Sequence, residues 1–356
     1  MHVTSRTRGQ DFLFGDLEKR VFIQMMRKWA DFSGLSVLTH CLMDNHFHAL
    51  LWVPGRVELD HAEILSRLKG IWPEEKVEAW EAYFQDHGPE TQAAMESAVV
   101  ERMADLPEFM RVLKQSFTTW YNRKHDMKGT LWDSRYRSVV VEGSPLALMS
   151  VAAYIDLNPL RAGIVEDPMA YSWSGYGAAM GGETVSRKGL EALVRLSRGH
   201  LPHEALQILQ KKTAAKLSDW REIAPEMAAS QQKRAAPENW RDVQSAYRIW
   251  LIHKGKSKSD VPRAKEKFRN RKGLDPVRVL AEYEAEGQIP LAAELQCRIR
   301  TFSKGVALGS EAFLESLFKS YRSCFGPKRK QGAKRIKGMG GAFMSLRFPQ
   351  DGERQN

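Results

Sequence analysis

Residues 36–54 read SVLTHCLMDNHFHALLWVP, and this stretch predicts an antiparallel pair of β-strands. Its first half, SVLTHCLM, is rich in apolar and β-branched residues, and its second half, HFHALLWV, ends at Pro54 and Gly55. Asp44 and Asn45 between the two halves are typical turn residues. Because strands joined by so short a turn pair with each other, we expect a β-hairpin here.

Further strand and helix patterns flank the hairpin on both sides. Alternating residues indicate strands, whereas apolar residues at spacings of three and four indicate helices with one buried face. The sequence predicts, in chain order, a strand at 2–7, a helix at 16–32, the hairpin, a helix at 106–125, a strand at 136–142 and a helix at 145–157.

The fold class follows from this order of elements. Runs of strands and helices mixed in this way favour an α+β fold, in which an antiparallel sheet carries helices on one face. Residues 57–105 are helical in pattern and acidic in places, and we interpret them as an insertion. Because the composition shifts after about residue 180, we expect a first domain over 1–180, a helical connection over 181–238 and a basic, mainly α-helical C-terminal region over 239–356.

The positive charge of the chain is concentrated in its C-terminal third. The 356 residues carry a formal net charge of +11, and the pI is near 9.5. Residues 254–272 hold nine Lys and Arg against two acidic side chains, and residues 319–337 hold eight and no acid. Such clusters are typical of surfaces that bind polyanions such as nucleic acids, although they also occur as solvated loops that keep a protein soluble.

The composition also argues against several classes of protein. Hydrophobic residues make up 43% of the chain and charged residues 27%, which is the balance of a globular protein. No apolar run reaches the roughly 18 residues of a membrane span, and no secretory leader is recognisable, so we expect cytoplasmic residence and no membrane partner. Three widely spaced cysteines indicate neither a disulfide framework nor a CxxC metal site.

The second strand of the hairpin carries a candidate metal site. Successive side chains of a strand point to opposite faces, so His46 and His48 share one face with their Cα atoms about 7 Å apart. Two imidazoles at that spacing can bind one ion. The same pattern also occurs as a pair of surface histidines or on a strand of a barrel, and the pattern alone does not separate these alternatives.

The helix expected over 145–157 carries a candidate nucleophile. Tyr154 and Asn158 are four residues apart, so both project from one face while the helix persists. The helix is expected to stop at the Asn158-Pro159 pair, because a proline pushes the preceding residue out of helical geometry. A helical tyrosine is usually a core or interface residue. The interpretation as a reactive pair therefore depends on its combination with the two histidines.

In these elements and in this order, the chain resembles the REP-associated tyrosine transposases, a branch of the one-tyrosine HUH transposases. The resemblance covers nearly all of residues 1–177 outside the insertion. It rests on the stretches HVTSRT, HCLMDNHFHALLWVP, EFMRVLKQSFTTWYNRKH, GTLWDSRYRSVVVE and YIDLNPLRAGIV, followed by YSWSGYG. The tail segments CRIRTFSKGVALGSEAFLESLF and FGPKRKQGAKRIKG also look like those of longer family members.

The resemblance implies a ferredoxin-like HUH endonuclease fold for the catalytic domain over 1–180. It also implies a metal-dependent transposase that cleaves and rejoins single-stranded DNA at hairpin-forming repeats. Tyr154 falls on the family's nucleophile, His46 and His48 on its paired metal ligands, and Asn158 on the side-chain oxygen that completes the metal site. Attack by the tyrosine leaves a 5′-phosphotyrosine and a free 3′-hydroxyl. Nitrogen and oxygen ligands of this kind suit Mg²⁺ or Mn²⁺.

Basic residues near these elements are predicted DNA contacts. Arg135 and Arg137 alternate along a strand and can follow a DNA backbone by pairing with its phosphates. Arg161, just beyond the helix, is a further candidate, with a solvated surface role as the alternative. The expected partner is single-stranded or hairpin DNA, bound by a monomer or a homodimer. In the tail, the predicted contacts are Lys328, Arg329, Lys330, Lys334 and Arg335.

Two other functions stay open at the level of the sequence. One is a non-catalytic nucleic-acid-binding regulator derived from a transposase. The other is a metal-dependent phosphoesterase that uses water, for which the two histidines suffice without the tyrosine. The presence of His46, His48, Tyr154 and Asn158 together favours the transposase.

Overall fold

The computed structural model describes residues 1–55, 58–197, 240–254, 305–327, 329–335 and 344–347. Their centre is a seven-stranded sheet with the strand order β2-β3-β1-β4-β5-β7-β6. β1 pairs with β3 and β4, and β2 pairs with β3, all antiparallel, whereas β4 and β5 are parallel. The sheet is therefore mixed, and the predicted antiparallel arrangement holds for β1 to β4. The strands are β1 (His2–Arg6), β2 (Ser36–Leu42), β3 (His46–Trp52), β4 (Arg137–Val141), β5 (Ala307–Gly309), β6 (Lys334–Arg335) and β7 (Met344–Leu346).

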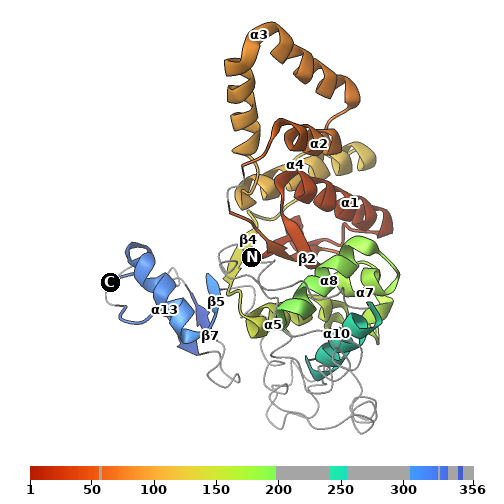
Figure 1. Ribbon diagram of the computed structural model, residues 1–356. Coiled ribbons are helices and arrows are strands. Elements are labelled where there is room, and N and C mark those ends of the chain that lie inside the picture. The colour runs from red at the N-terminus through yellow and green to blue at the C-terminus, as the bar shows by residue number, and fades with distance from the viewer. Residues whose placement is uncertain (56–57, 198–239, 255–304, 328, 336–343, 348–356) are drawn as a thin grey trace, which may run out of the picture.

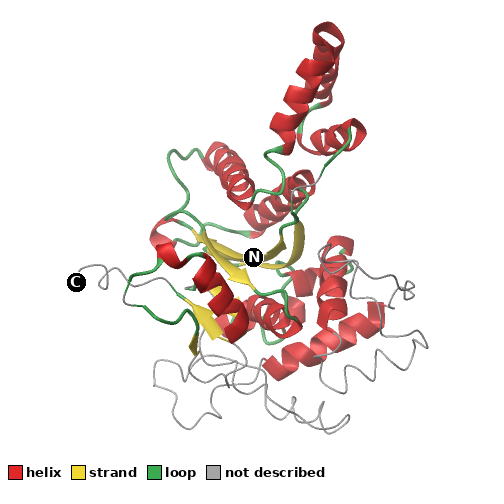
Figure 2. Ribbon diagram, turned by 60° about the vertical axis from the view of Figure 1, so that its left-hand side comes forward, coloured by secondary structure: helices red, strands yellow, loops and turns green. Residues whose placement is uncertain are grey.

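Helices cover both faces of β1 to β4 (Figure 1, Figure 2). One layer consists of α1 (Asp16–Ser33) and α4 (Leu106–His125). The layer on the opposite face consists of α5 (Pro145–Asp156), α7 (Gly175–Met180), α8 (Thr184–Ser197) and α10 (Trp240–Lys254). The α+β class is confirmed, but the prediction of helices on one face is wrong.

The composition of the hairpin strands explains the second layer. On β3, Phe47 and Ala49 belong to the core under α1 and α4, whereas Leu50 belongs to the core under α5. On β2, Leu42 faces the first of these cores and Leu38 the second. Strands with apolar residues on both faces need a helical layer on each.

The predicted element positions are confirmed to within a few residues, and local signals explain where the helices begin and end. α1 ends at Gly34, whose φ of 70° is the left-handed conformation that favours glycine. α4 begins after Asp105, whose carboxylate accepts a hydrogen bond from the Glu108 N–H. α5 ends before the Asn158-Pro159 pair, and the short helix α6 (Asn158–Ala162) follows at once.

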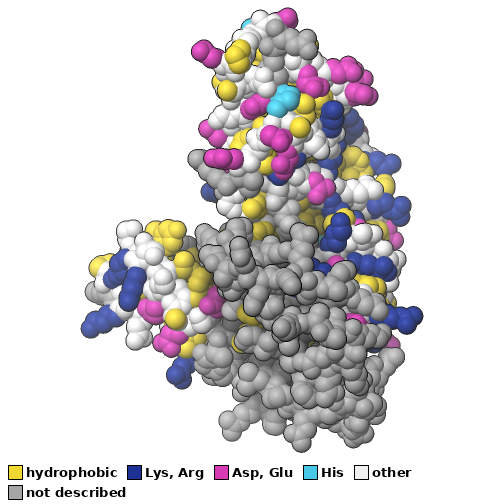
Figure 3. Space-filling model, in the orientation of Figure 1, with side chains coloured by type: hydrophobic (Ala, Val, Ile, Leu, Met, Phe, Trp, Pro, Cys, Tyr) yellow, Lys and Arg dark blue, Asp and Glu magenta, His cyan; other side chains and the backbone are white. Residues whose placement is uncertain are grey.

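The insertion between β3 and α4 folds into two helices, α2 (His61–Ile71) and α3 (Glu74–Val100). They enclose a small core of their own, in which Ile64, Leu68 and Trp80 pack with Phe32 of α1. α3 changes direction at Gly88, where φ is 76°. Residues 58–105 carry twelve Asp and Glu against four Lys and Arg, and their acidic side chains are visible in the upper part of Figure 3. We call this segment the acidic arm.

The C-terminal part combines helices with short strands. α10 packs against α5 and α8, and α13 (Glu311–Ser320) packs against β5 and β7. The sequence predicts a mainly α-helical region, but the described residues also contain β5, β6 and β7, which are too short to show an alternating pattern. The domain limits at 180 and 238 stay predictions. Within the described ranges, no helix has both the length and the apolar character needed to cross a bilayer.

Candidate functional site

His46 and His48 lie on the face of β3 that is covered by α5. Their ring centroids are 5.2 Å apart, and the rings are nearly perpendicular at 85°. His48 is buried, with 3% of its surface exposed, whereas His46 is half-buried. The face shared by the two histidines, expected from the strand period, is thus present in the structure.

The turn before β3 determines which ring nitrogen of a neutral His46 carries the proton. The Asn45 side chain donates from Nδ2 to the Gln10 carbonyl oxygen at 2.9 Å, which identifies its other end as the oxygen. That oxygen, Oδ1, lies 2.7 Å from His46 Nδ1 and can only accept a hydrogen bond. Nδ1 of a neutral His46 therefore carries the proton, and Nε2 presents a lone pair.

His48 has a second histidine as its partner. His2 of β1 is 1% exposed, and its Nε2 lies 3.0 Å from His48 Nδ1. The two rings are stacked at 25° with centroids 5.2 Å apart. Because β1 pairs antiparallel with β3 and Thr4 stands opposite His48, His2 is a diagonal neighbour of His48 on the same face. Sequence reasoning missed His2, since it did not predict which strand lies next to β3.

Tyr154 of α5 contacts His2 and His48 from the helical layer above them. We call His2, His46, His48 and Tyr154 the histidine and tyrosine cluster. Its ring contacts the His48 ring at a centroid distance of 5.5 Å and an angle of 83°, and the His2 ring at 5.9 Å and 75°. The tyrosine is 4% exposed. The hairpin histidines and the tyrosine, which the sequence singled out separately, are therefore neighbours in the fold.

Asn158 and Arg161 both donate hydrogen bonds to carbonyl oxygens at the end of α5. Asn158 Nδ2 donates to the carbonyl oxygens of Tyr154 and Ile155, at 2.9 and 3.2 Å. Arg161 donates to the Tyr154 carbonyl oxygen at 3.3 Å, and its guanidinium lies 5.5 Å from the centre of the Tyr154 ring. Both side chains thus contact Tyr154. Among the described residues no hydrogen bond joins Asn158 to His46 or His48.

The donor atoms of the two histidines fit a divalent metal ion. Burial lowers the pKa of His46 to about 4, with a further contribution from Arg6, and burial also lowers the pKa of His48 well below its ordinary value. Both imidazoles are therefore neutral at pH 7, as metal binding requires. In both rings Nδ1 is held by a neighbour, which is the usual way to orient a histidine that binds a metal through Nε2.

The side chain of Asn158 has one atom that can bind a metal ion, its carboxamide oxygen. Because its nitrogen donates to the end of α5, the oxygen Oδ1 is available as an acceptor. Within the described part of the chain, no group of three or more His, Cys, Asp and Glu side chains is arranged to hold a metal ion. A site made from two histidines and a carboxamide is of a different kind.

A buried carboxylate on the same helix holds the second layer together. Asp156 is fully buried and accepts hydrogen bonds from Thr39 Oγ1 of β2 at 2.8 Å, from the Tyr176 N–H of α7 at 3.1 Å and from the Tyr247 hydroxyl of α10 at 2.5 Å. Burial raises its pKa to about 7, although these hydrogen bonds lower it. No local pattern indicates this cluster, because its four parts are distant along the chain.

The predicted DNA contacts of the first 180 residues lie in different settings. Arg135 and Arg137 are exposed, before and at the start of β4. Arg161 is half-buried against Tyr154. Of the three, Arg161 alone lies in the histidine and tyrosine cluster.

The predicted contacts in the tail also differ from one another. Lys328 lies outside the described residues, whereas Lys330, Lys334 and Arg335 are exposed. Arg329 is half-buried and donates to the carbonyl oxygens of Gln331, Gly332 and Arg347. Its guanidinium also lies over the rings of Phe318 and Phe325. These hydrogen bonds and ring contacts give Arg329 a structural role, and its contact with DNA stays a prediction.

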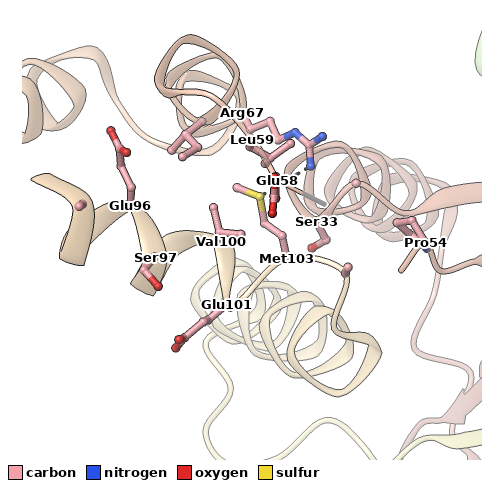
Figure 4. Close-up of a pocket in the computed structure, with 14 residues that line it drawn as sticks. Ser33, Pro54, Glu58, Leu59, Arg67, Glu96, Ser97, Val100, Glu101 and Met103 are labelled. Carbon is pink, nitrogen blue, oxygen red and sulfur yellow. Dashed lines mark hydrogen bonds between the residues drawn. The ribbon is translucent and has the colours of Figure 1, made fainter. Parts of the chain in front are cut away.

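A cavity of about 610 Å³ lies in the acidic arm, away from the histidine cluster (Figure 4). It is bounded by the end of α1, by α2 and by the last turns of α3. Arg67 and Met103 meet at one side of it, with 3.6 Å between the guanidinium Nη1 and the Met103 sulfur. None of the predicted site residues that the structure describes lines this cavity.

Comparison with protein-family models, with curated proteins and with solved structures gave no match to this chain.

Proposed function

We propose that this chain is a metal-dependent transposase or endonuclease that cleaves and rejoins single-stranded DNA through Tyr154. The observation that carries the proposal is the contact between the Tyr154 and His48 rings, 5.5 Å apart at their centroids. A candidate nucleophile and a candidate metal ligand, assigned from separate parts of the sequence, lie side by side. The resemblance of residues 1–177 to the REP-associated tyrosine transposases supplies the reaction class and the HUH fold.

His46, His48 and Asn158 would hold Mg²⁺ or Mn²⁺, through the Nε2 atoms of the histidines and Oδ1 of the asparagine. When bound, such an ion withdraws charge from a phosphate and orients the scissile bond. The assignment is supported by imidazoles that are neutral and whose Nδ1 atoms each lie within hydrogen-bond distance of a neighbouring side chain.

Tyr154 is the nucleophile of the proposed reaction. Its phenolic oxygen forms a bond to phosphorus, and the bond from phosphorus to the 3′ oxygen of the preceding nucleotide breaks. The phenol proton is released, the departing oxygen takes up a proton to become a 3′-hydroxyl, and the 5′ phosphate stays on the tyrosine. The bond energy is conserved, so the reverse reaction can rejoin a strand. The Arg161 guanidinium, 5.5 Å from the ring centre, stabilises negative charge as it develops on the phenol.

The proposed substrate is single-stranded DNA that folds into hairpins at palindromic repeats. The exposed Arg135 and Arg137, together with the exposed basic residues of the tail, would pair with its phosphates. Cytoplasmic residence and a monomeric or homodimeric state belong to the same proposal.

A covalent-adduct assay tests the proposal. The full chain is incubated with Mg²⁺ and a labelled single strand that carries the repeats flanking its own gene, and the mixture is separated by denaturing electrophoresis. We expect a labelled band at protein size with the wild type. The Tyr154→Phe variant should give none, while Tyr83→Phe, a matched change at an exposed tyrosine of the acidic arm, should behave like the wild type.

The other outcomes separate the alternatives. Binding without cleavage in both the wild type and Tyr154→Phe would favour the non-catalytic regulator. Cleavage that persists in Tyr154→Phe without an adduct would favour a phosphoesterase that uses water.

A further inference from the structure

A third histidine lies in contact with both parts of the proposed site. His2 is almost fully buried, and its Nε2 lies 3.0 Å from His48 Nδ1. Its ring also contacts the Tyr154 ring, at 5.9 Å between centroids. A buried imidazole in a strand costs free energy unless its polar atoms are paired. The hydrogen bond with His48 pairs one of the two ring nitrogens of His2.

The hydrogen bond between the two rings decides which nitrogen of His48 carries the proton. A hydrogen bond between Nε2 of His2 and Nδ1 of a neutral His48 needs one proton, which sits on one of the two atoms. If His48 Nδ1 holds it, His2 accepts, and Nε2 of His48 has a lone pair for a metal ion. If His2 Nε2 holds it, the proton of His48 moves to its own Nε2, and that atom cannot bind a metal.

The hydrogen bond at Nδ1 of His46 shows how a neighbouring side chain places the proton on the first of the two histidines. The Asn45 oxygen can only accept, so it holds the proton of His46 on Nδ1. His2 occupies the corresponding place beside His48, on the same edge of the ring. The two histidines of β3 are thus each held at Nδ1 by a neighbouring side chain, one from the turn and one from β1.

We propose that His2 is a positioning residue whose Nε2 accepts a hydrogen bond from the Nδ1–H of His48 and so leaves the Nε2 lone pair of His48 for a divalent metal ion. This inference rests on the proposed function in that it uses the same metal site. It assigns His2 no contact with DNA or with the reacting atoms.

The test reads the proton position directly in the metal-free protein. The full chain is labelled with ¹⁵N at its histidines, and long-range ¹H–¹⁵N spectra identify which nitrogen of His48 is protonated, with His48→Gln used for assignment. Two variants test whether the role of His2 depends on its hydrogen-bond acceptor. The side-chain oxygen of His2→Gln can accept where Nε2 did, whereas His2→Phe keeps a planar ring without an acceptor.

We expect His48 to be protonated at Nδ1 in the wild type and in His2→Gln. In His2→Phe that preference should be lost, and the affinity for Mn²⁺, measured by calorimetry, should fall roughly 10- to 100-fold, as is usual when the partner of a metal-binding histidine is removed. Circular dichroism checks that each variant is folded.

Three results would overturn the inference: protonation of wild-type His48 at Nε2, an unchanged proton position in His2→Phe, or an unchanged Mn²⁺ affinity in that variant. If His2→Phe does not fold, the wild-type spectrum and His2→Gln decide the question. The spectra need neither DNA nor cleavage, so failure of the proposed reaction in the adduct assay is distinguishable from failure of this inference.

Discussion

The rings of Tyr154 and His48 stand nearly perpendicular, at 83°, with their centroids 5.5 Å apart. One ring comes from a helix and the other from a strand of the sheet beneath it. Edge contacts of this kind between aromatic rings are favourable, and they hold both side chains in defined orientations. The contact therefore joins the proposed nucleophile to the proposed metal site, and changes at either end have testable effects.

Loss of either β3 histidine should weaken metal binding. We expect His46→Ala and His48→Ala each to lower the affinity for Mn²⁺ at least roughly tenfold at pH 7, because each removes one of the nitrogen ligands. Isothermal titration calorimetry measures the effect. His61→Ala is the matched control, since His61 belongs to the acidic arm and hydrogen-bonds to Glu96. Equal affinities in all four proteins would contradict the metal assignment.

Removal of the Asp156 carboxylate should destabilise the fold. Asp156→Ala leaves Thr39 Oγ1, the Tyr176 N–H and the Tyr247 hydroxyl without their buried acceptor, at a cost of about 3 kcal/mol. Asp156→Asn keeps the shape and one acceptor oxygen, so its cost should be less than half as large. Urea unfolding at pH 7 measures both.

An exposed aspartate provides the control for this prediction. Asp133→Ala should change the free energy of unfolding by about 0.5 kcal/mol or less, since Asp133 is exposed and bonds to Arg6 through its backbone N–H, which alanine retains. A cost for Asp156→Ala as small as that of Asp133→Ala would show that the carboxylate cluster does not stabilise the second helical layer.

Stability should fall in acid, and His40 should account for part of the fall. Burial, with a further contribution from Arg27, lowers the pKa of this histidine to about 3, whereas an unfolded chain has the ordinary value of 6.5. The folded form therefore binds fewer protons. The stability from the neutral His40 is complete above pH 6.5 and declines as the pH falls toward 3, by about 3 kcal/mol at pH 4.5.

Comparison of the wild type with His40→Gln separates the contribution of His40 from those of other groups that titrate in the same pH range. Asp156, whose pKa of about 7 lies above its ordinary value, acts in the opposite sense, because it is stabilising when protonated. The drop in unfolding free energy between pH 7 and pH 4.5 should be about 3 kcal/mol larger in the wild type than in His40→Gln. A drop of the same size in both proteins would rule out His40 as its source.

Replacement of two glycines by alanine should change the free energy of unfolding in opposite directions. At Gly189 in α8, a Cβ atom would lie 2.4 Å from the Leu38 carbonyl oxygen of β2, so Gly189→Ala must push the helix from the sheet and should cost roughly 1–3 kcal/mol. At Gly70 in α2, a Cβ atom meets no described atom within 4 Å, so Gly70→Ala should stabilise by about 0.5–1 kcal/mol. Thermal unfolding of the two variants gives both signs. Stabilisation by Gly189→Ala would be incompatible with this packing.

The exposed basic residues of the tail should contribute to DNA binding, whereas the half-buried Arg329 should contribute to stability. Changing the exposed Lys334 and Arg335 together to alanine should lower the affinity for a single strand and reduce the slope of log affinity against log salt by roughly 1.4, about 0.7 for each phosphate that is no longer neutralised. Fluorescence anisotropy at several salt concentrations measures the slope. Arg329→Ala should instead lower the melting temperature, because Arg329 donates to three carbonyl oxygens. A slope unchanged in the double variant would show that Lys334 and Arg335 do not bind the DNA backbone.

The sequence by itself determined the local elements and the identity of the candidate groups. Alternation in HFHALLWV placed His46 and His48 on one face, and helical spacing with the Asn158-Pro159 stop placed Tyr154 in the last turn of α5. These are properties of neighbouring residues, because the strand period, the helix period and the effect of proline act over a few residues.

Only the tertiary structure decided which elements meet. The pairing of β1 with β3 brings His2 to His48, and the packing of α10 on α5 brings Tyr247 to Asp156. It also decided that helices cover both faces of the sheet and that short strands extend it beyond β4. Such contacts join residues far apart in the chain, and they depend on which apolar surfaces bury one another, which no local pattern records.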